Sequence, residues 1–174
     1  AASQAAGSGS DYHADARLVS YSPALAKISQ AVVDPAARPV IEPFLVASSV
    51  NCIVAQRLAR RVCPDCKQDD PTITREELEQ AGLSAEEAAK CRPVKGAGCG
   101  NCSDTGFKGR VAVYEVMVLS ETLKEFVLNG ASSTEIKREA IRGGMSTLRR
   151  SSLNKVLEGG TTLSEVFRVS ARDD

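Results

Sequence analysis

The sequence predicts a mainly α-helical fold with a small β element, in which a tetracysteine module is followed by a compact four-helix C-terminal subdomain. Two C-x-x-C pairs define the module, and four short amphipathic segments after residue 120 define the subdomain. The chain has 174 residues, of which 43% are apolar and 25% are charged. This composition is typical of a globular protein that buries a core.

The first element is predicted at residues 44–61, directly after Glu42-Pro43, since proline is tolerated in the first turn of a helix. Apolar residues recur there at 3.6-residue spacing, which is typical of one buried helix face. Three arginines fall in the last turn, where positive charge complements the helix dipole. Cys52 lies inside this apolar stretch and is expected to be a small buried core residue.

The polar segment between the two cysteine pairs is predicted to carry two short helices, at residues 75–81 and 85–90. Each begins with a capping box, Thr74-x-x-Glu77 for the first helix and Ser84-x-x-Glu87 for the second. After the second cysteine pair, residues 111–116 are rich in β-branched side chains and are predicted to form a strand.

Four further helices are predicted after residue 120, each with an apolar stripe on one face. Their N-caps are assigned to Ser120, Ser132, Ser146 and Thr162, and glycines end the first three of these helices. Because each stripe needs a partner to bury it, the four helices are expected to form one compact subdomain.

Cys63 and Cys66 form one pair of the tetracysteine module, and Cys99 and Cys102 form the other. Each C-x-x-C turn lets two thiolates reach one ion, and two such turns complete a tetrahedral sulfur shell that suits Zn²⁺. Residues 67–98 separate the pairs by more than the usual ~15–20 residues, and the predicted helices account for the excess. An all-cysteine shell leaves no open coordination position, so the expected zinc is structural.

Other roles for the cysteines stay open. Disulfides are the main alternative, but nothing in the sequence signals export, and thiols in the cytosol stay reduced. A redox C-x-x-C would be expected within a βαβ pattern and without a second pair. Cys91, at the end of the second helix of the insert, could replace one of the four ligands and is left unassigned.

Charge and composition exclude several classes of function. The 22 Lys and Arg balance the 22 Asp and Glu, and the chain has four Phe, three Tyr and no Trp. The chain therefore lacks the excess of cations that phosphate contacts need and has few aromatic side chains for base stacking, so no nucleic-acid partner is expected. No apolar run approaches the ~18–20 residues of a membrane span, so no transmembrane segment is expected. With one histidine and no nucleophile–base pair, no catalytic or cofactor-binding residue is assigned.

Three stretches of the chain, taken in order, resemble the C-terminal part of the type II secretion and type IV pilus assembly (traffic) ATPases. They are EPFLVASSVNCIVAQRLARRVCPDC at 42–66, CGNCSDTGFKGRVAVYEVM at 99–117 and GGMSTLRRSSLNKVLEGGTTLSEVFRV at 143–169. The resemblance implies a homo-hexameric cytoplasmic motor, peripheral to the inner membrane and docked on inner-membrane platform proteins, that uses ATP and Mg²⁺. It also implies a tetracysteine zinc subdomain late in the motor domain and a closing helical subdomain.

Under this resemblance the chain divides into four segments. They are a leader or unmatched remnant of the motor domain (1–41), the last helix of the motor core (42–62), the tetracysteine zinc-binding module (63–117) and the helical C-terminal subdomain (118–170). The phosphate-binding loop of the family, G-x-x-x-x-G-K-[ST], does not occur in the chain. We therefore expect a fragment that does not hydrolyse ATP alone, because the ATP-binding core belongs to a longer parent. The alternative is an independent zinc-ribbon-like adaptor that binds other proteins.

Overall fold

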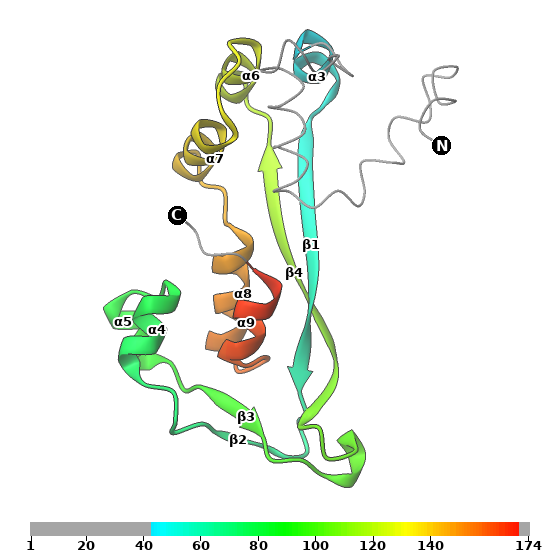
Figure 1. Cartoon of the computed structure of the whole chain (residues 1–174), viewed down its shortest axis with the longest axis vertical. Helices are drawn as coiled ribbons and strands as arrows, with labels where there is room; N and C mark the ends of the chain where they lie inside the picture. The colour runs from blue at the N-terminus through cyan, green and yellow to red at the C-terminus, as the bar shows by residue number, and fades with distance from the viewer. Residues whose placement is uncertain (1–42, 171–174) are drawn as a thin grey trace, which may run out of the picture. The chain divides into compact units, whose positions relative to one another are not determined.

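The computed structural model describes residues 43–170, which contain seven α-helices, one 3-10 helix and four strands (Figure 1). In chain order these are α3 (Pro43–Ser49), β1 (Cys52–Val62), β2 (Lys67–Asp69), α4 (Arg75–Ala81), α5 (Ala85–Lys90), β3 (Val94–Gly96), η1 (Gly100–Cys102), β4 (Phe107–Val118), α6 (Glu121–Leu128), α7 (Ser133–Arg142), α8 (Leu148–Leu157) and α9 (Leu163–Val169). The predicted leader or motor remnant at 1–41 lies outside the described residues. None of the helices within 43–170 has the length and apolar character that crossing a membrane requires.

The described residues confirm a mainly α-helical chain with a small β element. Strand β1 pairs with β4, and β2 pairs antiparallel with β3, which gives two separate two-stranded sheets. The chain divides into two compact units. Among the described residues, the first comprises 43–55 and Glu115–Met145, and the second comprises Gln56–Tyr114 and 146–170. Strands β1 and β4 contribute residues to both units.

The single helix predicted for residues 42–62 is wrong for most of its length. Helix α3 ends at Ser49, and residues 52–62 form strand β1. The valines and isoleucine of this segment suit a pleated sheet as well as a helix face, and pairing with β4 favours the strand. Cys52, which was expected in the core, is the first residue of β1 and is exposed.

The first unit is built from helices α3, α6 and α7. Helix α6 packs against both α3 and α7. Val46 of α3 is buried, as are Leu123 and Val127 of α6 and Ile136 and Ala140 of α7. The apolar stripes predicted for α6 and α7 are therefore the faces that these two helices bury.

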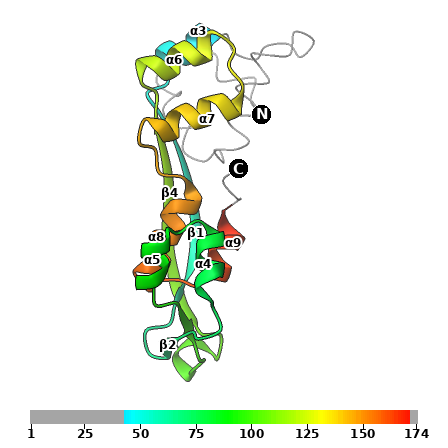
Figure 2. The same ribbon diagram turned by 90° about the vertical axis from the view of Figure 1, so that its left-hand side faces the viewer.

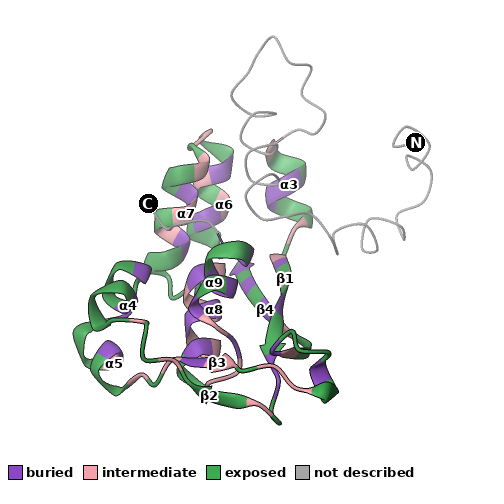
Figure 3. Cartoon of the chain, turned by 60° about the horizontal axis from the view of Figure 1, so that its bottom comes forward, coloured by how far each residue is buried: buried purple, intermediate pink, exposed green. Residues whose placement is uncertain are grey.

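The core of the second unit is built from α4, α5, α8 and α9, which lie together in Figures 1 and 2. Figure 3 shows the buried residues of α8 and α9 in purple. The buried apolar residues of this core are Leu78, Ala81, Leu83, Ala88, Leu153, Val156, Leu163 and Val166. The segment between the two cysteine pairs thus shares one core with the last two helices. Hydrogen bonds from Arg150 of α8 to Glu87 of α5 add an ion pair and lower the pKa of Glu87 to about 2.

The four helices predicted after residue 120 are present as α6 to α9, but one compact four-helix subdomain is not confirmed. Helices α6 and α7 belong to the first unit, with α3 as a partner, whereas α8 and α9 belong to the second, with α4 and α5. An apolar stripe shows that a helix has a buried face, but it does not identify the partner.

Most helix starts were predicted from their capping residues. In the structure, five of the predicted N-caps accept a hydrogen bond from a backbone N–H of the following turn: Thr74, Ser84, Ser120, Ser132 and Thr162. Helix α8 is capped by Thr147 instead of the predicted Ser146, and the Thr147 side chain accepts a hydrogen bond from the N–H of Arg150.

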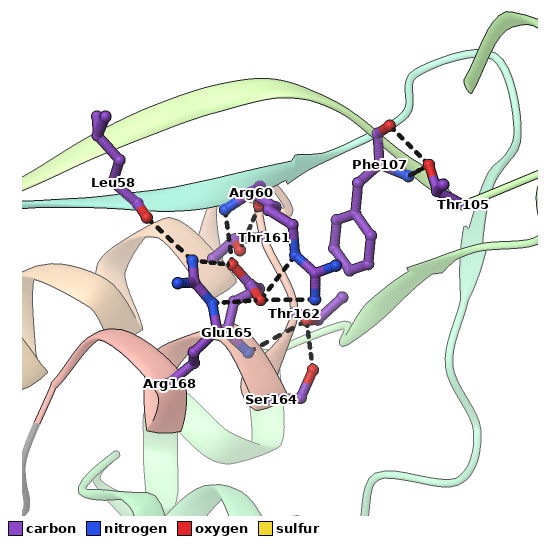
Figure 4. A network of polar contacts seen from close by, with 9 residues as sticks. All are labelled: Leu58, Arg60, Thr105, Phe107, Thr161, Thr162, Ser164, Glu165 and Arg168. Carbon is purple, nitrogen blue, oxygen red and sulfur yellow. Dashed lines mark hydrogen bonds and ion pairs between the residues drawn. The ribbon is translucent and has the colours of Figure 1, made fainter. Parts of the chain in front are cut away.

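A buried carboxylate, Glu165 of α9, joins α9 to strand β1 (Figure 4). Its Oε2 accepts a hydrogen bond from the backbone N–H of Arg60 at 2.7 Å, and its Oε1 accepts one from Arg60 Nε at 2.9 Å. Arg168 donates to the same two oxygens at 2.7 and 2.9 Å and also to the carbonyl of Leu58 at 3.0 Å. The Arg60 guanidinium also lies over the ring of Phe107, 4.1 Å from its centroid.

The backbone beside Glu165 is fixed to the same strand. Thr161 Oγ1 donates to the carbonyl of Arg60 at 2.8 Å, and the N–H of Val62 donates to the carbonyl of Gly160 at 3.0 Å. Burial alone would raise the pKa of Glu165, but hydrogen bonds from Arg168 and Arg60 lower it to about 2. Glu165 is therefore ionised and paired at neutral pH.

We expect Glu165→Gln to lower the free energy of unfolding by roughly 1–3 kcal/mol at pH 7, because the amide keeps the shape but loses the charge-assisted hydrogen bonds. The folded pKa of about 2 lies below the ordinary value of 4.5. The contribution of the carboxylate is therefore complete above the ordinary value and is lost as the pH falls toward 2. Urea unfolding measures this loss, with Glu121→Gln on exposed Glu121 as the control. An effect of equal size at neutral pH and at about pH 2.5 would contradict the assignment.

Candidate metal centre

The two sheets bring the four predicted cysteine ligands to one place. Strand β1 ends next to Cys63 and β4 begins shortly after Cys102, and the N–H of Cys63 donates to the carbonyl of Gly106 at 2.9 Å. In the second sheet Lys67 pairs with Gly96, so Cys66 and Cys99 emerge at the same end of β2 and β3. Each C-x-x-C turn therefore connects a strand of one sheet to a strand of the other, and the two strand pairings bring the turns together.

The four sulfur atoms lie at the spacing of a tetrahedral metal site. The Sγ–Sγ distances are 3.9 Å for Cys63–Cys99, 3.8 Å for Cys66–Cys102 and 3.6 Å for Cys99–Cys102. All four atoms lie within 4.8 Å of one another. Metal–sulfur bonds of about 2.3 Å in a regular tetrahedron place the sulfurs about 3.8 Å apart. The residues present therefore fit one metal ion with four thiolate ligands.

The same distances argue against disulfides. A disulfide holds its two sulfurs about 2.05 Å apart. All six cysteines are free thiols, and the three distances between ligand sulfurs are each 3.6 Å or longer. The arrangement thus favours a metal ion over any of the three possible disulfide pairings of these residues.

Two backbone N–H groups, one in and one after the second C-x-x-C turn, point at the sulfur of Cys102. The N–H of Cys99 donates to this sulfur at 3.2 Å, and the N–H of Gly106 donates to it at 3.3 Å. Burial alone would raise the pKa of the Cys102 thiol, but these backbone donors lower it to about 7. Burial raises the pKa of Cys66 to about 12 and also raises that of Cys99. A coordinated cation favours the thiolate form of all four ligands.

A polar contact outside the sulfur cluster joins the two C-x-x-C turns. Asn101 Nδ2 donates to Asp65 Oδ2 at 3.0 Å, and the Cys63 thiol lies 3.8 Å from the same oxygen. Each of these two polar residues lies between the cysteines of its own pair. Together they hold the two turns in register, as side chains around metal ligands commonly do.

Two glycines permit the close approach of the strands that carry the ligands. A Cβ atom built on Gly96 would lie 2.1 Å from the carbonyl oxygen of Gly106, and one built on Gly106 would lie 2.6 Å from that of Gly96. Any side chain at either position would force the backbones apart. Gly106 also has a φ of 73°, in the left-handed region that favours glycine.

The structure separates the six cysteines into three groups. Cys63, Cys66, Cys99 and Cys102 form the cluster, as the spacing predicted. Cys91 does not join it, because this residue ends helix α5 and packs against the core of the second unit. Cys52 is exposed at the start of β1. The approach of Gly96 to Gly106 was not predicted, although the glycines flanking the second pair were a signal of tight turns.

The chemistry open to this centre follows from its ligands. Four cysteines fill a tetrahedral shell and leave no position for water or substrate. Cys63 and Cys102 are buried, and the other two are half-buried. The site can therefore link the two C-x-x-C turns, but it offers no open position for metal-assisted catalysis.

The family model described as "Type II/IV secretion system protein" matches residues 31–168. The chain is 50% identical over 133 residues to a type IV pilus assembly ATPase PilB from Myxococcus xanthus, which covers 76% of this chain and 24% of the relative. It is 43% identical over 130 residues to PilB from Thermus thermophilus, covering 73% of this chain and 14% of the relative. It is 38% identical over 133 residues to a type II secretion system protein E from Aeromonas hydrophila, covering 76% of this chain and 26% of the relative.

We expect Gly96→Ala to weaken the metal centre, because its Cβ would collide with the backbone at Gly106. The cost is on the order of 1–3 kcal/mol of stability, typical of forced overpacking. Titration of the reduced chain with Co²⁺, followed by thiolate charge-transfer absorption, should show weaker binding. Gly100→Ala is the matched control, since no atom lies within 4 Å of a Cβ at Gly100. Equal Co²⁺ affinity in the two variants would show that the close approach is not needed.

Proposed function

This chain belongs to the type II/IV secretion system protein family, and on that premise we propose that it is the zinc-binding and C-terminal helical region of a secretion or pilus-assembly ATPase. The observation that supports a metal-binding region most strongly is the convergence of four cysteine sulfurs within 4.8 Å. Cys63, Cys66, Cys99 and Cys102 are the proposed ligands of one structural Zn²⁺, an ion that suits four thiolates in a tetrahedron.

The chain supplies only part of the proposed motor. It spans between 14% and 26% of the length of the relatives described above. The phosphate-binding loop G-x-x-x-x-G-K-[ST] does not occur among its 174 residues. In our proposal, ATP and Mg²⁺ bind to a motor core supplied by other parts of a longer protein, and this region contributes structure and contacts to that core.

The proposed partners are proteins. Further copies of the full-length protein would form a homo-hexamer in the cytoplasm, peripheral to the inner membrane. Inner-membrane platform proteins of the secretion or pilus machine would receive its motion. The balance of 22 cationic and 22 anionic residues is consistent with protein contacts, because a nucleic-acid surface needs an excess of cations.

The chain's own residues act by holding the region rigid. Glu165 and its two arginines anchor α9 to the strand that precedes Cys63, and the α4–α5 insert packs on α8 and α9. The zinc ion would join the ends of both sheets when bound. A force generated in the motor core would then act on one connected structural unit and not on two separate sheets.

The test compares Cys66→Ser with Cys52→Ser, because Cys52 is exposed and outside the cluster. We expect about one zinc per chain in the unmodified protein and in the Cys52 variant, and little zinc in the Cys66 variant, by elemental analysis. In the full-length protein, Cys66→Ser should lower the rate of ATP hydrolysis roughly tenfold or more. The 174-residue chain alone should not hydrolyse ATP.

Two results would contradict the proposal. Zinc retained by the Cys66 variant would exclude this residue as a ligand. ATP hydrolysis by the isolated chain at the rate of the full-length protein would place the nucleotide site inside these residues and not in a separate motor core.

A further inference from the structure

A cationic cavity lies in the second unit, beside the first C-x-x-C turn, which contributes Pro64 to its lining. Its volume is about 320 Å³, and its walls come from the end of β1, the start of β2, strand β4 and the C-terminal part of α8 with the glycines that follow. The charged residues that line it are Arg61, Lys67, Arg110, Lys155 and Glu158. The lining of the cavity therefore carries four cationic side chains and one carboxylate.

The single carboxylate is already paired. Lys155 Nζ donates to both oxygens of Glu158, at 2.9 and 2.8 Å. Across residues 43–170, no ion pair or hydrogen bond is formed by the side chains of Arg61, Lys67 or Arg110. These three cations therefore remain available to a negatively charged ligand.

The unpaired cations sit on elements that the fold holds in place. Arg61 and Arg110 lie on the two neighbouring strands β1 and β4, and both line the cavity, so their positive charges together attract an anion. The Lys67 ammonium lies against Gly159, so close that a Cβ there would be 2.7 Å from its Nζ. The N–H of Val62 donates to the carbonyl of Gly160 at 3.0 Å and fixes this glycine turn to β1.

We propose that this cavity binds a soluble anion with two or three linked phosphate groups. Arginine presents a planar fork that matches phosphate oxygens, and lysine adds a compact point charge. A volume of about 320 Å³ lies at the small end of the range for pockets that enclose small molecules. Three unpaired cations on three chain segments suit several linked phosphates better than one. The proposal does not depend on the proposed motor function.

The test uses the zinc-loaded 174-residue chain and inorganic pyrophosphate, with inorganic phosphate for comparison. We expect saturable binding of pyrophosphate by calorimetry, tighter than that of phosphate and weakened by added salt. The NMR signals of the Arg61 and Arg110 side chains should shift during the titration. The Arg61→Gln/Arg110→Gln double variant should bind about tenfold more weakly or worse, since each arginine contributes charge-assisted hydrogen bonds.

A matched control removes the same charge elsewhere in the second unit. Lys90→Gln/Arg92→Gln alters two exposed cations that do not line the cavity, and its affinity should stay within about twofold of the unmodified chain. An equal loss in both double variants would reduce the effect to net charge and overturn the proposal. So would binding to vesicles of phosphatidylglycerol without saturable binding of pyrophosphate. Arginine signals that remain unshifted at saturation would place the anion elsewhere and would also overturn it.

Discussion

Two strand pairings that end at the same four sulfur atoms constrain the second unit more than any other feature. Pairing of β1 with β4 delivers Cys63 and Cys102, and pairing of β2 with β3 delivers Cys66 and Cys99. The segment between the cysteine pairs becomes a closed loop, and closing a loop limits the unfolded chain more than it limits the folded one. That loop carries α4 and α5 into the core formed with α8 and α9. A metal ion at the sulfurs would therefore stabilise a helical core as well as two short sheets.

A second set of contacts holds the end of strand β1 near Cys63. Glu165 accepts hydrogen bonds from both the backbone and the side chain of Arg60, three residues before Cys63. The carbonyl of Gly160, in the glycine turn that precedes α9, accepts a hydrogen bond from Val62, next to Cys63 of the cluster. The position of the first C-x-x-C turn thus depends on α9, although the turn and the helix are far apart in sequence. The same turn forms part of the wall of the cationic cavity, so one set of backbone contacts supports both proposed sites.

Local signals in the sequence predicted much of the fold, and long-range pairing decided the rest. The helices at 75–81 and 85–90 were predicted at their observed bounds, because a capping box is a local signal formed by two residues three positions apart. The clustering of Cys63, Cys66, Cys99 and Cys102 was predicted from C-x-x-C spacing, which is also a local signal. Strand β1 was predicted as a helix because its apolar spacing fits both periods until β4 pairs with it. The division of α6 to α9 between two units depends on tertiary packing. The network around Glu165 depends on Arg60, which lies more than 100 residues away in the sequence. Neither feature can be predicted from a local sequence pattern.

Zinc K-edge X-ray absorption on the zinc-loaded chain tests whether the four cysteines bind the metal, because it reports the atoms bound to the metal. We expect a single shell of four sulfur atoms at about 2.3 Å, with no oxygen or nitrogen neighbour. A shell that contains water, histidine or carboxylate ligands, or fewer than four sulfurs, would contradict a closed tetracysteine centre. The region would then need another explanation for the convergence of Cys63, Cys66, Cys99 and Cys102.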